Sequence, residues 1–356
     1  MRNWPYLKLK GKVDIVDVEF PSLKGNPLQD PWIRSTVIYS PCSNSLDAAG
    51  RDIPVIIHLP AFFGTSHQVL NRDPFSKNLF EQADTVILKQ SLPFILIVPD
   101  GFTSYGGSQY LNSSATGNYE DMIARDLVDW IQKEIKIPPP YGLIGRSSGG
   151  YGALTLGMKH PELFSAIACH SGDLYFEWCY KRDFPEAIQV LKQYSSIRAF
   201  LSDFWKKEKP HPQDFTTLNV IAMSACYSPN SRSPLKFDLP FDLETSELVE
   251  EIWRKWLNCD PVVQVNQYAE NLKKLKLLFL DCGNKDEYFL HLGARIFAKY
   301  LKKIKVPRHY EEYPDGHRGT GWRFSVSLPL LARSLQKTGR KKFEKAEARN
   351  QKLKGI

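Results

Sequence analysis

The sequence lacks a hydrophobic segment suited to crossing a membrane, and it lacks a cysteine pattern typical of an exported, disulfide-bonded fold. The uncharged run 53–71 contains two prolines, two histidines and a glycine, so it does not resemble a spanning helix. The six cysteines are scattered without a CxxC pair, which favours reduced thiols. The N-terminal stretch MRNWPYLKLKGK carries charges where a signal peptide needs apolar residues, and we expect a cytoplasmic protein.

Several motifs of nucleotide and metal chemistry are also missing. The chain contains no GxGxxG fingerprint and no P-loop, so neither a dinucleotide nor a nucleoside triphosphate is an expected ligand. It has no HExxH sequence and no acidic or cysteine cluster at metal-ligand spacing. We therefore expect a protein that works without a cofactor or a metal ion.

The positive charge is concentrated at one end. The formal net charge is +8, but residues 337–356 hold eight Lys or Arg against two Glu, which leaves the rest nearly neutral. A basic surface for nucleic acid is therefore not expected on the body of the protein. We interpret residues 337–356 as a basic tail forming a solvated helix, with contact to an acidic surface as the alternative.

Short apolar runs alternate with helical patterns, which predicts an α/β protein with a mainly parallel central sheet flanked by helices. Two runs at the start have the alternation of antiparallel strands, and later runs end in polar or glycine-rich turns, as strands buried on both faces do. Three segments repeat apolar residues at helical spacing. The predicted strands are 13–18, 35–39, 55–59, 94–98, 142–145, 166–169, 276–280 and 309–313, and the predicted helices are 119–135, 148–159 and 288–301.

One region breaks this rhythm. Residues 173–275 form a stretch far longer than a crossover between parallel strands requires, and they are rich in aromatic residues and proline. Helical patterns occur near 186–206 and 244–257. We predict a helical cap inserted over the carboxyl edge of the sheet, within one domain that spans residues 1–336.

The strongest motif is a nucleophile elbow. Residues 145–149 read Gly-Arg-Ser-Ser-Gly, which fits the pattern G-x-S-x-G with Ser147 at its centre. A serine on a sharp strand-to-helix turn needs flanking glycines because β-carbons there would collide. An apolar strand precedes the motif and a helical pattern follows it. Ser147 is therefore the expected nucleophile, and Ser148, one place outside the glycine frame, is a weaker alternative.

A serine hydroxyl needs a base, and the base needs an orienting carboxylate. In this architecture the chain order is Ser, then Asp or Glu, then His. We assign His317, in a Gly-His turn after the last predicted strand, as the base. Asp286, in the loop after strand 276–280, is the expected orienting acid, and Asp281 is the alternative.

Acyl transfer also needs donors for a developing oxyanion. The N–H group of Ser148 begins a helix and is one expected donor. The second is expected from the loop after strand 55–59, where Pro60 has no N–H, so Phe62 or Ala61 supplies it. His170, just past a predicted strand, is a candidate for lining the site, and so is Trp178 in the aromatic-rich insertion.

At these residues the sequence resembles the "putative esterase" branch of the α/β-hydrolases, which groups S-formylglutathione hydrolases of the esterase D type, feruloyl and acetylxylan esterases, enterochelin-type esterases and mycolyltransferases. The resemblance covers roughly residues 35–335. It implies serine carboxylic-ester chemistry, with Ser147, Asp286 and His317 at the triad positions. The matching segments are 145–154, 160–164, 170–172, 281–287, 313–317, and 100–101 together with Tyr119 and Glu120. Through this resemblance Glu120 becomes a further candidate for lining the site.

We therefore expect a serine esterase that forms an acyl-enzyme on a small-molecule or glycan-linked ester. An acyltransferase with the same triad is one alternative. A non-catalytic hydrolase fold, binding glycan through its aromatic residues or anionic polymer through its tail, is another. The sequence predicts neither the ester nor the oligomeric state.

Overall fold

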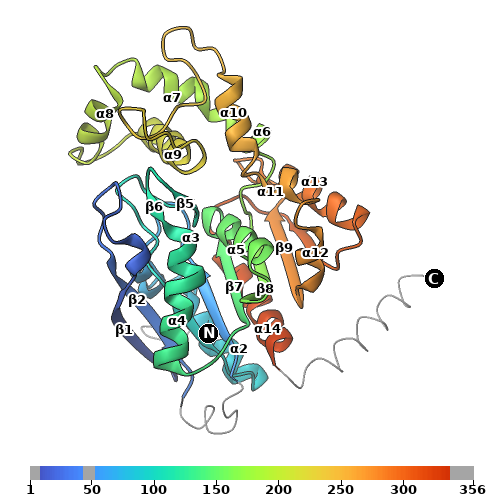
Figure 1. Cartoon of the computed structure of the whole chain (residues 1–356). Helices are drawn as coiled ribbons and strands as arrows, with labels where there is room; N and C mark the ends of the chain where they lie inside the picture. Colours follow the sequence, from blue (N-terminus) through green and yellow to red (C-terminus); the bar gives the residue numbers. More distant parts are fainter. Residues whose placement is uncertain (1–8, 43–52, 337–356) are drawn as a thin grey trace.

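The computed structural model describes residues 9–42 and 53–336. Its centre is a twisted sheet of eight strands in the order β1-β2-β4-β3-β7-β8-β9-β10 (Figure 1). Strand β2 pairs antiparallel with β1 and β4, and all other neighbours in the sheet are parallel. The strands are β1 (Lys12–Glu19), β2 (Ile33–Ser40), β3 (Val55–Leu59), β4 (Ile95–Val98), β7 (Tyr141–Arg146), β8 (Phe164–His170), β9 (Leu277–Gly283) and β10 (His309–Tyr313).

The predicted fold class is confirmed: the chain has the α/β-hydrolase architecture, with a mainly parallel sheet between helices. Every residue of β3 and β4 is buried, because helices cover both faces of the parallel region and leave its strands no solvent-facing side. Every strand expected from an apolar run is present, with ends shifted by a few residues. The antiparallel opening by the first two strands is also correct.

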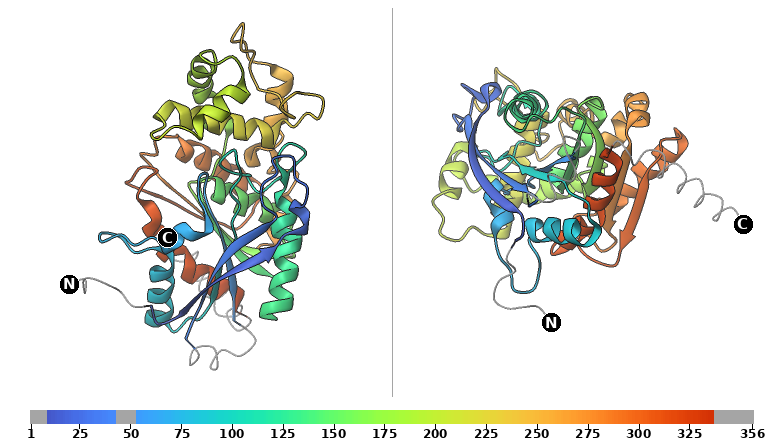
Figure 2. Two further views of the ribbon diagram at one scale, coloured as in Figure 1. Left: turned by 90° about the vertical axis from the view of Figure 1, so that its left-hand side faces the viewer. Right: turned by 90° about the horizontal axis from the view of Figure 1, so that it is seen from below.

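Helices cover the two faces of the sheet in separate groups (Figure 2). Strand β4 leads through a small hairpin of β5 (Asn112–Ser113) and β6 (Gly117–Asn118) into the helix of residues 119–135. That helix packs on one face together with α5 and α13, and α2 and α14 pack on the other. The bounds are α2 (Leu79–Gln90), α5 (Ser148–Lys159), α13 (Leu290–Lys303) and α14 (Phe324–Leu335), with short 3-10 turns η1 (Pro21–Leu23), η3 (Ser66–Leu70) and η7 (Thr320–Arg323).

The helix of residues 119–135 is continuous, as its apolar spacing predicts, but it is not a regular α-helix. Segments η4 (Met122–Leu127) and η5 (Ile131–Ile135) have the wider π-helical turn. The short α-helical pieces α3 (Tyr119–Asp121) and α4 (Val128–Trp130) alternate with them. The apolar spacing of the sequence does not distinguish the π-helical turns from the α-helical ones.

The long segment between β8 and β9 is helical, and its helices from α6 to α10 lie beyond the carboxyl end of the sheet, whereas α12 packs beside the sheet against α5 (Figure 1). The pattern near 186–206 corresponds to two helices, because Ser196 interrupts it and caps the second one. The pattern near 244–257 is helical only from Glu250 onward. The helices are α6 (Phe176–Cys179), η6 (Lys181–Asp183), α7 (Phe184–Leu191), α8 (Ile197–Phe204), α9 (Pro212–Tyr227), α10 (Glu250–Leu257), α11 (Pro261–Gln264) and α12 (Ala269–Lys274).

Hydrogen bonds attach this helical segment to the loops at the carboxyl end of the sheet. The Ser113 hydroxyl donates to the carbonyl oxygen of Ala225 at 2.6 Å, and the Trp205 indole donates to that of Ser104 at 3.0 Å. Across residues 9–42 and 53–336, none of the helices combines the length and the apolar character that crossing a bilayer requires. The basic tail 337–356 lies outside the described residues.

Candidate active site

Ser147 lies on a sharp turn between β7 and α5. Its backbone has φ 56° and ψ −128°, a conformation that costs a residue with a β-carbon on the order of 1–3 kcal/mol. The N–H group of Ser147 donates to the carbonyl oxygen of His170 at 2.9 Å, and its own carbonyl accepts from the Tyr151 N–H at 2.9 Å. These bonds hold the strained turn, and the half-buried side chain remains open to solvent.

The flanking glycines are required by close backbone contacts. A β-carbon added at Gly145 would lie 2.2 Å from the carbonyl oxygen of Gly149. One added at Gly149 would lie 2.0 Å from the carbonyl oxygen of Leu59, on the neighbouring strand. Both distances are far inside van der Waals contact, so the G-x-S-x-G spacing is a packing requirement of this turn.

The structure brings His317 and Asp286 together from loops that follow β10 and β9. Nδ1 of His317 lies 2.8 Å from Oδ2 of Asp286, and both side chains are buried. Because an ionised carboxylate can only accept, Nδ1 carries the proton and Nε2 of the neutral ring is left as the acceptor. The other oxygen of Asp286 accepts from the N–H group of Tyr288 at 2.9 Å, which fixes the carboxylate.

The loop that carries His317 is held from several sides. The backbone N–H group of His317 donates to Oε2 of Glu287 at 2.7 Å. The ring of Tyr288 meets the imidazole edge to face, with centroids 4.9 Å apart. Arg146, which precedes Ser147, donates from Nη1 to the carbonyl oxygen of His317 at 3.2 Å and to the Thr320 hydroxyl at 3.3 Å. The elbow and the histidine loop are therefore tied directly, although in the described part of the chain the Ser147 hydroxyl makes no hydrogen bond.

A small cavity lies where the oxyanion donors are expected. Its volume is about 10 Å³, close to the space of one water molecule, and Ser148, Ala61 and Phe62 are among its lining residues. In the loop after β3, the N–H groups of Phe63 and Gly64 donate to the carbonyl oxygens of Gly106 and Ala61. Among the described residues, the N–H groups of Ala61 and Phe62 have no acceptor, so both remain candidates for the second donor.

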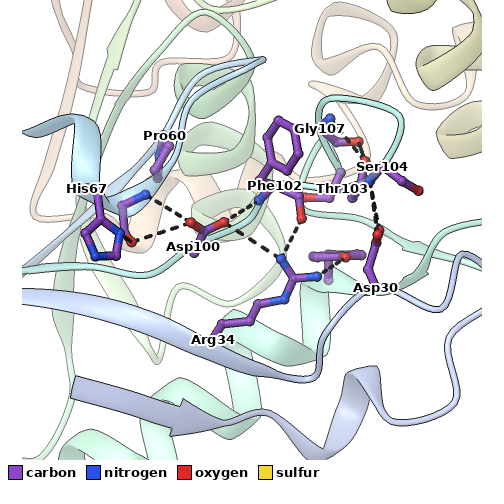
Figure 3. A network of polar contacts seen from close by, with 12 residues as sticks. Asp30, Arg34, Pro60, His67, Asp100, Phe102, Thr103, Ser104 and Gly107 are labelled. Carbon is purple, nitrogen blue, oxygen red and sulfur yellow. Dashed lines mark hydrogen bonds and ion pairs between the residues drawn. The ribbon is translucent and has the colours of Figure 1, made fainter. Parts of the chain in front are cut away.

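A polar network fixes the two loops that form this cavity (Figure 3). The Asp100 carboxylate accepts from the N–H groups of Ser66 at 3.2 Å and Phe102 at 2.9 Å. Arg34, buried on β2, donates to the carbonyl oxygen of Phe102 at 2.5 Å, and Asp30 accepts from the Ser104 N–H at 3.0 Å. The loops are thereby anchored to the sheet before any ligand binds.

The side chains of His170 and Asp281 contact each other on the face of the sheet that α14 covers. The His170 imidazole is buried, with Nδ1 donating to Oδ1 of Asp281 at 2.7 Å and Nε2 accepting from the Ser327 hydroxyl at 2.8 Å. Oδ2 of Asp281 accepts from Nε of Arg323 at 2.6 Å. These contacts join β8 and β9 to α14, so the structure pairs Asp281 with His170 and not with His317, while the backbone carbonyl of His170 supports the Ser147 turn.

Glu120 lies away from the elbow. Glu120 forms ion pairs with Lys159 at 2.5 Å and His160 at 2.9 Å, at the end of α5 that is farthest from Ser147. Trp178 on α6 is half exposed and packs beside Tyr175. The family resemblance pointed to Glu120 and the aromatic-rich insertion to Trp178, and neither signal carries information on the distance from Ser147.

A buried network next to the elbow was not predicted. The Asp173 carboxylate accepts from the side chains of Gln109 at 3.0 Å, Tyr180 at 2.9 Å and Ser148 at 3.3 Å. Gln109 also donates to the hydroxyl of Tyr227 on α9 at 2.8 Å. Burial raises the pKa of Asp173 above its ordinary value, against the lowering effect of these donors. The network connects the helical segment to the first residue of α5.

A large cleft borders the elbow on the side of α2 and α14. Its volume is about 900 Å³, within the range of small-molecule sites. The loop 60–64, Arg146 and the residues after His317 form one end of it. No group of three or more His, Cys, Asp or Glu side chains in residues 9–42 and 53–336 is arranged to hold a metal ion.

Comparison with known proteins gives one family. A sequence model of the family described as "Putative esterase" matches residues 38–330. The MPT51 antigen of Mycobacterium leprae (strain TN) is 30% identical over 137 residues, which cover 36% of this chain. The chain thus spans only 43% of the length of that curated relative.

Solved structures show the same fold at low identity. A ferulic acid esterase superposes with a TM-score of 0.57 and 16% identity, covering 92% of this chain and 100% of the other. A fluorophosphonate-binding serine hydrolase of Staphylococcus aureus superposes with a TM-score of 0.56 and 14% identity, covering 91% and 98% of the two chains. The family resemblance read from the sequence is confirmed. The chain belongs to the family described as "Putative esterase" and has the α/β-hydrolase fold.

Proposed function

We propose that the protein hydrolyses carboxylic esters through an acyl-enzyme on Ser147, with His317 as general base and Asp286 as its orienting acid. The observation that carries the proposal is the buried 2.8 Å contact between Nδ1 of His317 and Oδ2 of Asp286, next to the glycine-flanked turn of Ser147. That contact leaves Nε2 as the basic nitrogen of the ring.

In the first half-reaction Nε2 of His317 takes the proton of the Ser147 hydroxyl as the oxygen attacks the ester carbonyl. The negative charge then develops on the former carbonyl oxygen. The N–H group of Ser148, together with that of Ala61 or Phe62, stabilises it in the small cavity. Collapse breaks the bond to the alcohol, which leaves with the proton from His317.

In the second half-reaction water replaces the alcohol. His317 takes a proton from the water, the hydroxide attacks the acyl carbon, and the bond to Ser147 breaks with return of the proton to its oxygen. Asp286 keeps the imidazole in the required tautomer and stabilises the imidazolium formed in each half. The proposal requires a hydrogen bond between the Ser147 hydroxyl and Nε2 of His317 in the complex with substrate.

We also propose that the helical segment 173–275 acts as a cap over this site. Support comes from its position beyond the carboxyl end of the sheet and from the Asp173 network, which connects it to Ser148. In this arrangement the cap limits the size of the acyl or alcohol group that reaches Ser147.

The test is labelling and turnover in matched variants. Wild-type protein should react with a fluorophosphonate probe and hydrolyse 4-nitrophenyl acetate. Ser147→Ala should lose the label and reduce kcat by about 10⁴–10⁶. Ser202→Ala, an exposed serine on α8, is the control and should behave as wild type. Retention of labelling and turnover in folded Ser147→Ala would remove Ser147 from the reaction, and product analysis with added alcohols would show whether water or an alcohol is the acceptor.

A further inference from the structure

The cleft beside the elbow has an unbalanced charge. Two cationic side chains, Arg146 and Lys77, are among its lining residues, and none of the described residues that line it is Asp or Glu. Arg146 precedes Ser147, and Lys77 lies just before the first turn of α2. The cleft therefore carries one positive charge at Arg146, next to the candidate nucleophile in the chain, and a second at Lys77.

Neither cation is neutralised within the described residues. Arg146 donates to two neutral oxygens, the carbonyl of His317 and the hydroxyl of Thr320. Lys77 donates to the neutral hydroxyl of Thr85 at 2.8 Å. Neither forms an ion pair with a carboxylate in that part of the chain, and Asp286 influences Arg146 only at longer range. A half-buried cation without a counter-ion attracts an anionic ligand more strongly than an exposed one does.

The remaining lining suits an organic anion. Phe62, Trp322 and Phe324 supply apolar surface. Two buried lining residues also carry polar atoms without a partner among the described residues, Nδ1 of His58 and Oε1 of Gln82. Burial lowers the pKa of His58 to about 3, so its ring is neutral at ordinary pH and adds no third charge.

We infer that this cleft binds the carboxylate of an ester substrate, so that the enzyme prefers esters carrying a negative charge over neutral esters of the same size. The inference rests on the proposed function, because Arg146, which lines the cleft, directly precedes Ser147 in the chain. Arg146 holds the anionic group near the reacting carbonyl, Lys77 provides the second cation, and the aromatic side chains cover the connecting carbon chain.

The test compares kcat/KM for matched pairs of esters. One pair is the 4-nitrophenyl half ester of adipic acid and its neutral methyl ester, which places the charge on the acyl side. The other is 4-acetoxybenzoate and its methyl ester, which places the charge on the leaving group. We expect a preference for the charged member in one pair, and the pair that shows it identifies the side of the ester that enters the cleft.

Variants assign the preference to the cleft. Lys77→Gln and Arg146→Gln should each lower the charged-to-neutral ratio of kcat/KM by about fivefold or more, the effect of losing one hydrogen bond to a charged group. Lys89→Gln removes the same charge from an exposed position at the other end of α2 and should leave the ratio unchanged. Added salt should also reduce the ratio in wild type.

Binding gives a readout that does not depend on turnover. In Ser147→Ala, calorimetry with the preferred charged ester should show a Kd that rises about fivefold when Lys77→Gln is added. Turnover of the neutral esters with no preference for charge in either pair, or a preference unaltered in Lys77→Gln and Arg146→Gln, would overturn the inference and leave the proposed esterase intact. Failure to turn over any ester, with no labelling of Ser147, would instead reject the proposed function.

Discussion

The guanidinium of Arg146 lies 3.2 Å from the carbonyl oxygen of His317, and this hydrogen bond joins two loops that are 171 residues apart in the sequence. One loop carries the candidate nucleophile and the other the candidate base. Their relative position thus depends on a side chain that also lines the large cleft, so ligand binding there and alignment of the two groups are physically connected.

Asp281 on β9 and Asp286 in the loop after it should respond differently to removal of charge. Asp286→Asn should lower kcat for 4-nitrophenyl acetate by about 10⁴, because the amide no longer holds the required tautomer of His317. Asp281→Asn should leave kcat within about tenfold and reduce the free energy of unfolding, because it breaks the contacts with His170 and Arg323. Steady-state kinetics and urea unfolding of both variants measure the difference. Equal loss of kcat in the two would contradict the assignment of Asp286.

The glycines of the elbow should be intolerant of alanine. Gly149→Ala places a β-carbon 2.0 Å from the carbonyl oxygen of Leu59, so strand and helix must move apart, at about 3 kcal/mol of unfolding free energy. Gly321→Ala meets no atom within 4 Å and should change stability by less than about 0.5 kcal/mol. Urea titration of both proteins tests the contrast, and a stable Gly149→Ala would show that the turn is looser than this contact implies.

The Asp173 network should contribute to both stability and rate. Asp173→Ala leaves the buried donors of Gln109, Tyr180 and Ser148 without their acceptor, which should reduce the free energy of unfolding by about 2–4 kcal/mol. Tyr227→Phe removes one acceptor of Gln109 and the 3.1 Å contact with the Tyr180 hydroxyl, and should cost about 1 kcal/mol. Because Ser148 supplies an expected oxyanion donor, kcat should fall more in Asp173→Ala than in Tyr227→Phe. Similar values for both variants would argue that the network does not position Ser148.

Asp183, at the start of α7, should make stability depend on pH. Burial raises its pKa from 3.8 to about 6, and the neighbouring Arg182 only partly opposes this. Between about pH 4 and pH 6 the folded chain then holds a proton that the unfolded chain has released, so this group's contribution to stability falls as pH rises through that window. Asp183→Asn should exceed wild type by about 1–2 kcal/mol above pH 6.5, with the gain vanishing below about pH 4. An equal gain at pH 4 and pH 7, measured by urea unfolding, would exclude burial of the charge as the cause.

Local patterns predicted the sheet and the elbow well. Runs such as Val55–Leu59 are apolar because both faces of the strand are covered, and glycine at positions 145 and 149 is dictated by backbone contacts within one turn. Helix α9 was not predicted, because its residues are buried almost continuously from Thr217 to Tyr227 and no single apolar face repeats along it. A pattern with one buried face is what sequence periodicity detects.

Tertiary pairing explains what the sequence did not predict in the site. Asp281 lies near the end of β9 and Asp286 in the loop after it, and the tertiary structure decides which of them meets His317. Asp173 has no motif around it, since its partners come from residues 109, 148 and 180. The unpaired charges of Arg146 and Lys77 become visible only when the lining of one cleft is known.

The pairing of β10 along only one side, with β9, has a consequence for synthesis on the ribosome. The loop that holds the imidazole follows this outermost strand, whereas the serine turn is translated 170 residues earlier. Under the proposed mechanism, a nascent chain can therefore complete most of its sheet while remaining unable to turn over ester. Reaction with an active-site probe would then show that the final strand has docked, and the rate at which reactivity appears would measure the last step of folding.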